Sequence, residues 1–283
     1  MTLLEGKAVV VTGAGRGLGR AYALDAAAHG AGVVVNDVDL AEAEAVATEI
    51  VAAGGRAVAD GHSVAGWDSA AAIVETCLAT FGQLDGFVAN AGVIATGLPW
   101  EMTEERIRAV IDVNLLGALF CGTHALAAMV DQGHGSIAIT TSSTHMGRPK
   151  LGVYGATKGA LVTLTHSWAI DTMPTKIRVN AFSPSAQTRM SGASPTGVSA
   201  GSPPPERNAG IVTYLLSDRA DGITGQVLQL RGEQIVVVAP PTLTEHTVSD
   251  PAWTAERVAG ALDPLLRCHA QPVGWWPEGR KNP

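Results

Sequence analysis

A tyrosine and a lysine stand four residues apart in the segment Tyr154-Gly155-Ala156-Thr157-Lys158. In a helix this spacing places the phenol and the ammonium on one face. A free tyrosine has a pKa near ~10, so it is a poor base at neutral pH. Lowering that pKa to ~7 requires about 4 kcal/mol of preference for the phenolate, which nearby positive charge can supply. The pair is a candidate acid–base centre, although the same spacing also occurs between plain helix-surface residues.

Hydroxyl groups precede this pair at the end of an expected strand. Residues Ser136–Thr140 form the strand, which runs through Thr141 into Ser142 and Ser143. The carboxyl edge of a parallel sheet is where ligands bind in open α/β folds. A hydroxyl there can donate to a reacting oxygen as that oxygen becomes anionic. Counting along the strand from Gly135 favours Ser142.

A glycine-rich turn, Thr12-Gly13-Ala14-Gly15-Arg16-Gly17-Leu18-Gly19, follows the first expected strand and opens the first helix. Glycines let the backbone approach a pyrophosphate closely, and the helix N-terminus offers unpaired N–H groups. The pattern predicts a dinucleotide site, with Gly13, Gly17, Leu18 and Gly19 as contacts.

An acidic residue, Asp37, follows the second expected strand. Its carboxylate can accept hydrogen bonds from the adenosine ribose and would repel a 2′-phosphate, which favours NAD over NADP. Arg16 in the turn argues for the opposite preference, because a basic side chain can pair with that phosphate. We expect the carboxylate to prevail.

Short, uncharged, β-branched runs alternate with Ala-rich segments of helical length. The expected strands are Ala8–Val11, Gly32–Asn36, Arg56–Ala59, Asp85–Ala89, Ser136–Thr140, Ile177–Ala181 and Gln226–Leu230. The expected helices are Gly17–His29, Leu40–Ala53, Trp67–Phe81, Glu104–Val130 as two helices meeting near Gly117, Val153–Thr172, Glu206–Leu216 and Ala255–Leu266. This alternation predicts an α/β fold of the Rossmann type, a doubly wound parallel sheet of about seven strands with helices on both faces.

Two segments depart from the alternation. Residues 191–205 are almost wholly Ser, Gly, Ala, Pro and Thr, which suits either a mobile flap over the site or a plain connector. Residues 239–283 carry three tryptophans and an expected helix. We expect a dinucleotide-binding domain over residues 1–238 and a C-terminal extension that packs on the core or on a neighbouring subunit.

Composition narrows the class of protein. With 46% hydrophobic residues in 283, the chain can bury a large core, and a net charge of −7 argues against nucleic acid or an anionic membrane as partner. No uninterrupted apolar run reaches the ~18–20 residues that span a bilayer. The three cysteines form no CxxC pair and no metal-ligand spacing, so no metal is expected. A cytoplasmic location is the expectation.

Taken together, the motifs resemble the short-chain dehydrogenase/reductase family over roughly Leu4 to Gly232. The family's Thr-Gly-x-x-x-Gly-x-Gly appears as Thr12 to Gly19, its Tyr-x-x-x-Lys as Tyr154 and Lys158, and its Asn-Asn-Ala-Gly as Ala89-Asn90-Ala91-Gly92, with the first Asn lost. The resemblance implies an enzyme that moves a hydride between a nicotinamide cofactor and a secondary alcohol or ketone.

The resemblance also implies roles for individual residues. Asn114 would hold a water that links Lys158 to solvent, and Ser142 would orient the substrate oxygen; the family's usual spacing before Tyr154 points instead to Thr141, and direct alignment of Thr-Ser-Ser to Ser143. The remaining cofactor contacts implied are Ser63, Val64, Asn90, Ala91, Gly92 and Thr188. The family's acidic residue near the adenine is replaced by His62, and its Pro-Gly after strand six by Pro184-Ser185.

Within the family, the pattern is most similar to the (3R)-hydroxyacyl-CoA dehydrogenase domains of multifunctional β-oxidation enzymes. Arg148, Lys150 and Arg189 are candidates for CoA phosphates, or plain surface charges. An apolar pocket is expected from Ile94, Trp100, His145, Met146 and Leu151, which suits an acyl chain, a steroid or a terpenoid alcohol equally.

Three further expectations remain. Residues 115–130 are apolar on almost every face, and the resemblance implies that this helix and the one bearing Tyr154 form a subunit interface of a homodimer or homotetramer. The altered motifs leave open a cofactor-binding protein without catalytic activity. An NADPH-dependent biosynthetic ketoreductase is the other alternative.

Overall fold

A computed structural model describes residues 2–186, 203–243, 245–249 and 253–269 of the chain. The chain divides into two compact units, Met1–Val238 and Ala239–Pro283. The first unit contains the sheet and the helices that cover it. The second contains α9 (Ala255–His269). The packing of this extension on the core or on a neighbouring subunit stays a prediction.

The sheet of the first unit has eight strands in the order β3-β2-β1-β4-β5-β6-β7-β8. Strands β1 to β7 are parallel to their neighbours, and β8 is antiparallel to β7. The strands are β1 (Ala8–Thr12), β2 (Gly32–Asn36), β3 (Arg56–Asp60), β4 (Gly86–Ala89), β5 (His134–Thr140), β6 (Lys176–Ser183), β7 (Val227–Arg231) and β8 (Gln234–Val237). The order reverses between β1 and β4, so the predicted doubly wound α/β fold is confirmed.

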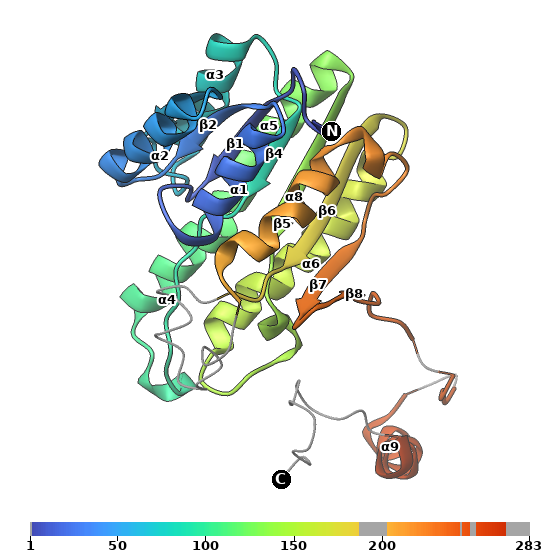
Figure 1. The fold of residues 1–283 in the computed structure, drawn as a ribbon. Helices are drawn as coiled ribbons and strands as arrows, with labels where there is room; N and C mark the ends of the chain where they lie inside the picture. Colours follow the sequence, from blue (N-terminus) through green and yellow to red (C-terminus); the bar gives the residue numbers. More distant parts are fainter. Residues whose placement is uncertain (1, 187–202, 244, 250–252, 270–283) are drawn as a thin grey trace. The chain divides into compact units, whose positions relative to one another are not determined.

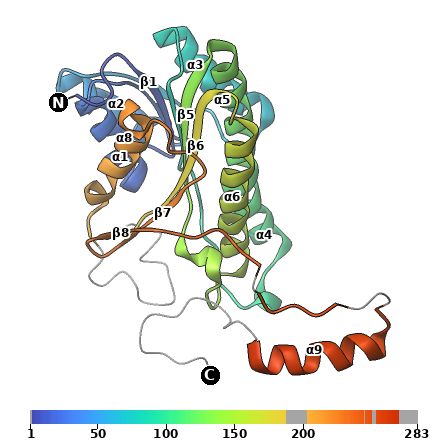
Figure 2. The ribbon, with the colours of Figure 1, turned by 90° about the vertical axis from the view of Figure 1, so that its right-hand side faces the viewer.

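Helices cover both faces of this sheet (Figure 1, Figure 2). One face carries α1 (Gly17–Ala28), α2 (Leu40–Ala52) and α8 (Ala209–Leu216). The other carries α3 (Trp67–Phe81), α5 (Gly117–Gln132) and α6 (Gly152–Asp171), and α4 (Glu104–Ile111) packs against α6. With helices on both faces, the carboxyl edge of the sheet is where open α/β folds bind their ligands.

Burial on both faces explains the uncharged strands. In β1, Val9 and Val11 pack into the core under α1, α2 and α8, whereas Ala8 and Val10 pack into the core on the opposite face. Successive side chains of a strand alternate between faces, so a strand buried on both sides must be apolar throughout. This is why the strand runs were readable from the sequence.

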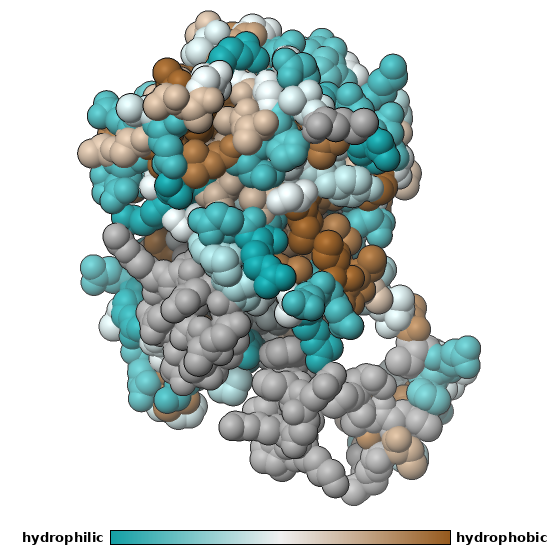
Figure 3. All heavy atoms as spheres, in the orientation of Figure 1, coloured by the Kyte–Doolittle hydropathy of each residue, from teal (hydrophilic) through white to brown (hydrophobic). Residues whose placement is uncertain are grey.

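The sheet has eight strands, one more than the seven that the sequence analysis expected. A two-residue loop, Gly232-Glu233, joins β7 to β8, and Gly232 has φ +60°, the left-handed region that favours glycine. All four residues of β8 are exposed, including Ile235 and Val237. The brown area at the right of Figure 3 lies over this β7–β8 side of the molecule.

The two helices expected to meet near Gly117 form one continuous run. A π-helical turn, Asp112–Leu116, joins α4 to α5, and the Gly117 N–H donates to the Asp112 carbonyl five residues back. A Cβ at Gly117 would lie 2.7 Å from Val64 Cγ2, which explains the glycine. The helical run is therefore unbroken from Glu104 to Gln132.

The run Glu104–Gln132 is long and apolar enough, by length and composition, to be a candidate membrane span. The expectation concerned uninterrupted apolar runs and is not contradicted, because Asn114, Thr123 and His124 interrupt the apolar residues of this helix. Core helices of soluble proteins have the same character, and here Cys121, Ala125 and Met129 pack into the core against the sheet.

The hydroxyl of Tyr22 on α1 is buried without a hydrogen-bond partner among the described residues, and burial raises its pKa well above the usual value. Because an unpaired buried hydroxyl carries a desolvation cost, we expect Tyr22→Phe to stabilise the protein by about 1 kcal/mol. Urea unfolding of both proteins measures the change. A variant less stable than the parent would show that the hydroxyl has a partner.

Candidate active site

The glycine turn is braced by residues after β4. Asn90 Nδ2 donates to the carbonyl oxygens of Thr12 (2.9 Å) and Gly13 (3.2 Å), and Thr12 Oγ1 accepts from the N–H groups of Asn90 (3.0 Å) and Ala91 (3.1 Å). A Cβ at Gly19 would lie 2.1 Å from the Gly13 carbonyl oxygen. The turn therefore closes only with glycine at this position, and Asn90 fixes its shape.

The N-terminus of α1 is open to an anion. Arg16 at the N-cap has an extended backbone and provides no side-chain cap, and the first turn of the helix holds no acidic residue. The first N–H groups of a helix have no partner within it. Gly13 and Gly17 both have positive φ, +63° and +56°, so the backbone here can turn toward a ligand. These features fit the pyrophosphate of a dinucleotide.

Asp37 lies directly after β2 and is buried. Its Oδ2 accepts from the Gly15 N–H at 3.0 Å, and its Oδ1 accepts from the Asp39 N–H at 3.1 Å. The carboxylate is thereby held against the glycine turn. Each oxygen retains a lone pair that can accept from a ribose hydroxyl.

The segment after β3 contains a network that the sequence analysis missed. Asp60 ends the strand with a buried carboxylate that receives hydrogen bonds from Asn36, His62 and Thr76. Next to it, Val64 is buried and Ser63 is exposed. The sequence signal for this network was Asp60 itself, an acidic residue at the carboxyl end of a strand.

Tyr154 and Lys158 lie on one buried face of α6. Lys158 is 3% exposed, and its ammonium donates to the Thr140 carbonyl at 2.8 Å. Its Nζ lies 5.7 Å from the centre of the Tyr154 ring. Burial lowers the pKa of Lys158 to about 8. Burial also raises the pKa of Tyr154 to about 12, against the lowering that the sequence analysis expected, because desolvation of the phenolate outweighs the hydrogen bond from Ser142.

Of the three hydroxyls considered for the reacting oxygen, Ser142 is the one whose side chain is hydrogen-bonded to Tyr154. Its Oγ also accepts from the Thr144 N–H at 3.3 Å, which fixes the start of the short helix Ser143–Met146. Thr141 is turned away, since its Oγ1 donates to the Lys158 carbonyl at 3.0 Å. Thr141 thus ties β5 to α6.

Asn114 lies within the π-helical turn and is 1% exposed. Its Oδ1 accepts from the Val93 N–H at 2.7 Å, and its Nδ2 donates to the Val93 carbonyl at 2.9 Å and to Thr157 Oγ1 at 3.4 Å. Both amide hydrogens are donated. The side chain therefore joins the segment after β4 to the helix that carries Tyr154, and Gly92 leaves room for it.

Apolar residues surround the Tyr154 ring. Val110 and Leu151 are buried against it, and Ile94 is partly buried in the same cluster. The Gly97 N–H donates to the Lys150 carbonyl at 2.9 Å, which ties the loop after β4 to the loop before α6. Trp100, predicted to line the pocket, is 80% exposed.

The loop after β6 is held by Asn208, a residue that the sequence analysis did not single out. Asn208 Oδ1 accepts from the Ser185 N–H at 3.0 Å, and Nδ2 donates to the Ser185 carbonyl at 3.1 Å. Thr188, Arg189 and most of the Ser/Gly/Pro-rich segment lie outside the described residues.

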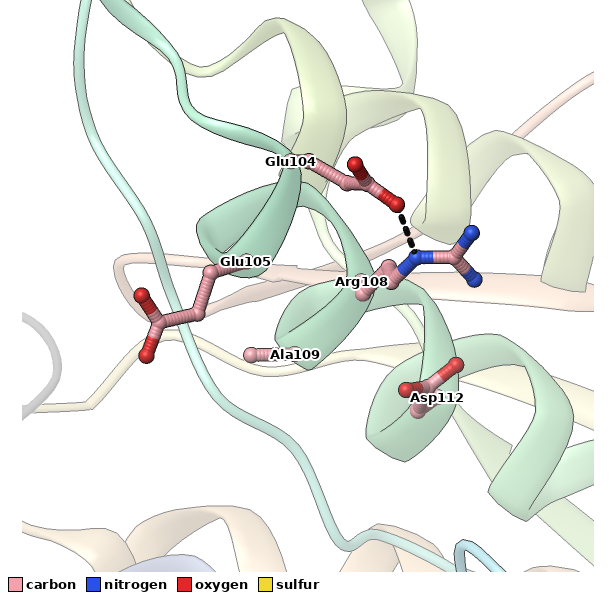
Figure 4. Close-up of a pocket in the computed structure, with 5 residues that line it drawn as sticks. All are labelled: Glu104, Glu105, Arg108, Ala109 and Asp112. Atoms are coloured by element: carbon pink, nitrogen blue, oxygen red, sulfur yellow. Dashed lines mark hydrogen bonds and ion pairs between the residues drawn. The ribbon is translucent and has the colours of Figure 1, made fainter.

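A separate hollow of about 610 Å³ lies along α4 (Figure 4). Its lining residues are Glu104, Glu105, Arg108, Ala109 and Asp112. Arg108 Nε donates to Glu104 Oε1 at 2.7 Å. None of the candidate catalytic side chains lines this hollow, so we place the candidate site at the sheet edge.

Comparison with known proteins gives a consistent family. The sequence profile of the short chain dehydrogenase family matches residues 7–197. An uncharacterized oxidoreductase of Methylorubrum extorquens is 39% identical over 246 residues, 82% of this chain and 99% of that protein. The 2,5-dichloro-2,5-cyclohexadiene-1,4-diol dehydrogenase of Sphingobium indicum is 36% identical over 248 residues, 82% of this chain and 98% of that one. A crystal structure of a short chain dehydrogenase from Mycobacterium avium superposes with a TM-score of 0.86 at 34% identity, covering 97% of this chain and 99% of that one.

The buried charge of Lys158 should cost stability at neutral pH. Its pKa is about 8 in the folded protein against 10.5 in the unfolded chain. The cost is therefore complete below pH 8 and vanishes above pH 10.5. We expect Lys158→Met to stabilise the protein by about 1–3 kcal/mol at pH 7 and to lose that gain near pH 10.5.

Urea unfolding at the two pH values measures this difference, with Lys176→Met at an exposed position as the control. A variant that gains nothing at pH 7 would contradict the assignment of an uncompensated buried ammonium.

Proposed function

This chain belongs to the short-chain dehydrogenase family, and from that premise we propose that it transfers a hydride between NAD and a secondary alcohol or ketone. The observation that carries the proposal is the group of buried Tyr154, buried Lys158 and half-buried Ser142 at the sheet edge that also holds the glycine turn. The family assignment supports oxidoreductase chemistry.

When bound, a nicotinamide ring supplies the hydride acceptor or donor. In the oxidation direction, the Tyr154 phenolate takes the proton of the alcohol at its Oη while the C–H electron pair leaves with the hydride. Ser142 donates a hydrogen bond to the substrate oxygen. Reduction returns the proton from Tyr154 to the carbonyl oxygen as the hydride arrives at carbon.

The protonation state that Tyr154 needs depends on the direction of the reaction. With a pKa of about 12 in the protein alone, Tyr154 is a neutral acid that suits proton donation to a ketone. For alcohol oxidation the phenolate needs additional positive charge beside it. The Lys158 ammonium, 5.7 Å from the ring centre, supplies part of it, and the positive charge of an oxidised nicotinamide would supply more.

Asn114 is proposed to complete the proton path. Its side-chain amide is committed to Val93 and Thr157, so the group left to position a water near Lys158 is its backbone carbonyl. A π-helical turn breaks the regular pairing of helix carbonyls, and such turns are frequent at functional sites.

NAD is the proposed cofactor because Asp37 is buried beside the glycine turn. A carboxylate there can accept from both ribose hydroxyls and repels a 2′-phosphate. Arg16 is exposed in the same turn and is the observation that favours the alternative, an NADPH-dependent ketoreductase.

The substrate is proposed to be a largely apolar secondary alcohol or ketone. Val110, Leu151 and Ile94 supply apolar contacts around Tyr154. A 3-hydroxyacyl thioester, a steroid and a terpenoid alcohol all meet this requirement. Arg148 and Lys150 follow Ser142 in the same loop and would suit the phosphates of a thioester carrier.

A homodimer or homotetramer is proposed from the outer face of the long helix. Val130 on α5 and Ile170 on α6 are exposed apolar side chains, and residues 115–130 of the long helix carry no charged side chain. Burial of such a face against a second copy would remove it from water. A cytoplasmic location is likewise proposed.

Tyr154→Phe tests the mechanism directly. Because the variant keeps the ring and removes the acid–base group, kcat should fall by about 10²–10⁴-fold while NADH affinity stays within about threefold. Turnover across a panel of secondary alcohols and ketones, with NADH affinity by fluorescence, measures both quantities.

Ser142→Ala and Ser143→Ala form a matched pair in the same assay, since only Ser142 reaches the phenol. Activity that survives in Tyr154→Phe would contradict the mechanism. Cofactor binding without turnover on any substrate would favour a non-catalytic member of the family.

Asp37→Asn tests the cofactor preference. The parent should bind NADH at least about tenfold more tightly than NADPH, and the variant should lose most of that preference because the repulsion of the 2′-phosphate is removed. Titration calorimetry with both coenzymes measures the ratio. Asp39→Asn, at an exposed neighbouring position, serves as control. A parent that prefers NADPH would overturn the choice of NAD.

A further inference from the structure

Tyr154 lies in the part of α6 that the helix itself holds least. The helix begins at Gly152, and its N-cap residue, Leu151, makes no side-chain hydrogen bond to the first turn. The first N–H groups of a helix have no partner within it, so an uncapped first turn depends on contacts from outside the helix. In the proposed mechanism the Oη of Tyr154 must stay within hydrogen-bond reach of the substrate oxygen. The contacts that fix this turn therefore bear on the reaction.

The hydroxyl of Thr157 contacts the backbone of Tyr154. Thr157 is buried, and its Oγ1 donates to the Tyr154 carbonyl oxygen, three residues earlier in the helix, at 2.8 Å. A hydroxyl has one hydrogen to donate, and its oxygen can also accept. With that hydrogen used, Thr157 Oγ1 is the acceptor in its other contact, which joins it to Asn114 Nδ2 at 3.4 Å. The direction of both hydrogen bonds is thereby fixed.

These two hydrogen bonds end a chain that begins in the loop after β4. The Asn114 side chain accepts from the Val93 N–H at 2.7 Å and donates to the Val93 carbonyl at 2.9 Å, so the amide is held by both polar groups of one residue in that loop. Thr157 connects the amide to the carbonyl of Tyr154. Ile94, which follows Val93, packs in the apolar cluster that contains the Tyr154 ring. The loop therefore meets Tyr154 at the backbone and at the ring.

We propose that Thr157 is a positioning residue for Tyr154, because its hydroxyl transmits the position of Asn114 to the first turn of α6. The phenol is thereby held at the distance from Ser142 and Lys158 that proton transfer requires. A hydroxyl bonded to a carbonyl of its own helix bends the helix locally, and here the bend acts on the peptide group of Tyr154. The inference rests on the proposed oxidoreductase function and adds a residue that acts through Tyr154 without contact with the reacting atoms.

A purely structural role for Thr157 would have a different signature, and Thr165 shows what it would be. Thr165 lies later in α6 and is fully buried, and its Oγ1 donates to the Leu161 carbonyl at 2.8 Å. This is the same kind of hydrogen bond in the same helix, made to neither Asn114 nor Tyr154. Loss of the hydroxyl should cost similar stability at both positions, and only the loss at Thr157 should reach the reaction.

The test removes the hydroxyl and measures turnover. In Thr157→Val, which keeps the shape of the side chain, we expect kcat for the best substrate in the panel of secondary alcohols to fall by about 10- to 100-fold, because a displacement of about 1 Å is enough for such a loss. KM and the affinity for NADH should stay within about threefold. Thr157→Ala removes the hydroxyl without the β-branch and should show the same loss. Thr157→Ser keeps the hydroxyl and should retain at least about half of the parent kcat.

The pH dependence of kcat separates positioning from stability. A phenol displaced from the Lys158 ammonium loses part of the charge that favours the phenolate, so the pH of half-maximal oxidation should rise by about half a unit or more in Thr157→Val. Thr165→Val is the matched control. It should lower the urea midpoint by as much as Thr157→Val and leave kcat and its pH profile unchanged.

The outcomes separate the inference from the function on which it rests. An unchanged kcat and pH profile in Thr157→Val and Thr157→Ala overturns the inference and leaves the proposed function intact. An equal loss of kcat in Thr157→Ser does the same, because it would assign the effect to the methyl group instead of the hydroxyl. A parent that oxidises no alcohol and reduces no ketone of the panel overturns the proposed function and the inference together.

Discussion

A buried ammonium without a counter-ion is the constraint on which the site depends. Lys158 is almost fully buried, and its charge is met by the neutral carbonyl of Thr140 instead of a carboxylate, with no ion pair to it among the described residues. A neutralising carboxylate would stabilise the lysine but would cancel the positive field at Tyr154. The protein instead tolerates the cost, because β5 and α6 are tied by Thr141 and packed on both sides. The resulting field is available to the phenol.

The parallel sheet makes the remaining geometry possible. Because the parallel strands run the same way, their carboxyl ends meet at one edge. The glycine turn, Asp37, Asp60, Asn90 and Ser142 each lie at the end of a different strand. Polar cross-links then fix neighbouring loops to one another: Asn90 to the turn, Asn114 to α6, and Asn208 to the loop after β6. Each of these asparagines satisfies backbone groups that regular structure leaves unpaired. These hydrogen bonds therefore fix the loops that carry the site to one another.

The strands and helices were predictable because burial on both faces forces apolar runs and short polar turns, and the order of the motifs located the site. The features that the sequence did not reveal depend on how groups are placed in three dimensions. Desolvation raises the pKa of Tyr154, and the hydrogen bond from Ser142 lowers it. The spacing between Tyr154 and Lys158 does not show which effect is larger. The choice among Thr141, Ser142 and Ser143 required the direction of each hydroxyl. The network of Asp60 and His62 joins residues whose partners, Asn36 and Thr76, are distant in sequence. A local signal for the β7–β8 hairpin was present in the sequence, because Gly232 and Glu233 form a two-residue turn. The sequence analysis did not use it.

The π-helical turn between α4 and α5 has a consequence for how the chain can vary in length. It contains one residue more than an α-helix needs to cover the same distance, and each residue rotates a helix by about 100° and advances it by 1.5 Å. Removal of one residue between Asp112 and Leu116 would therefore let the turn close into regular α-helix, and Cys121, Ala125 and Met129 on α5 would keep their places in the core. What the deletion would remove is the widened turn, which holds Asn114 against Val93 and Thr157. The extra residue thus serves the site and not the packing of the helix.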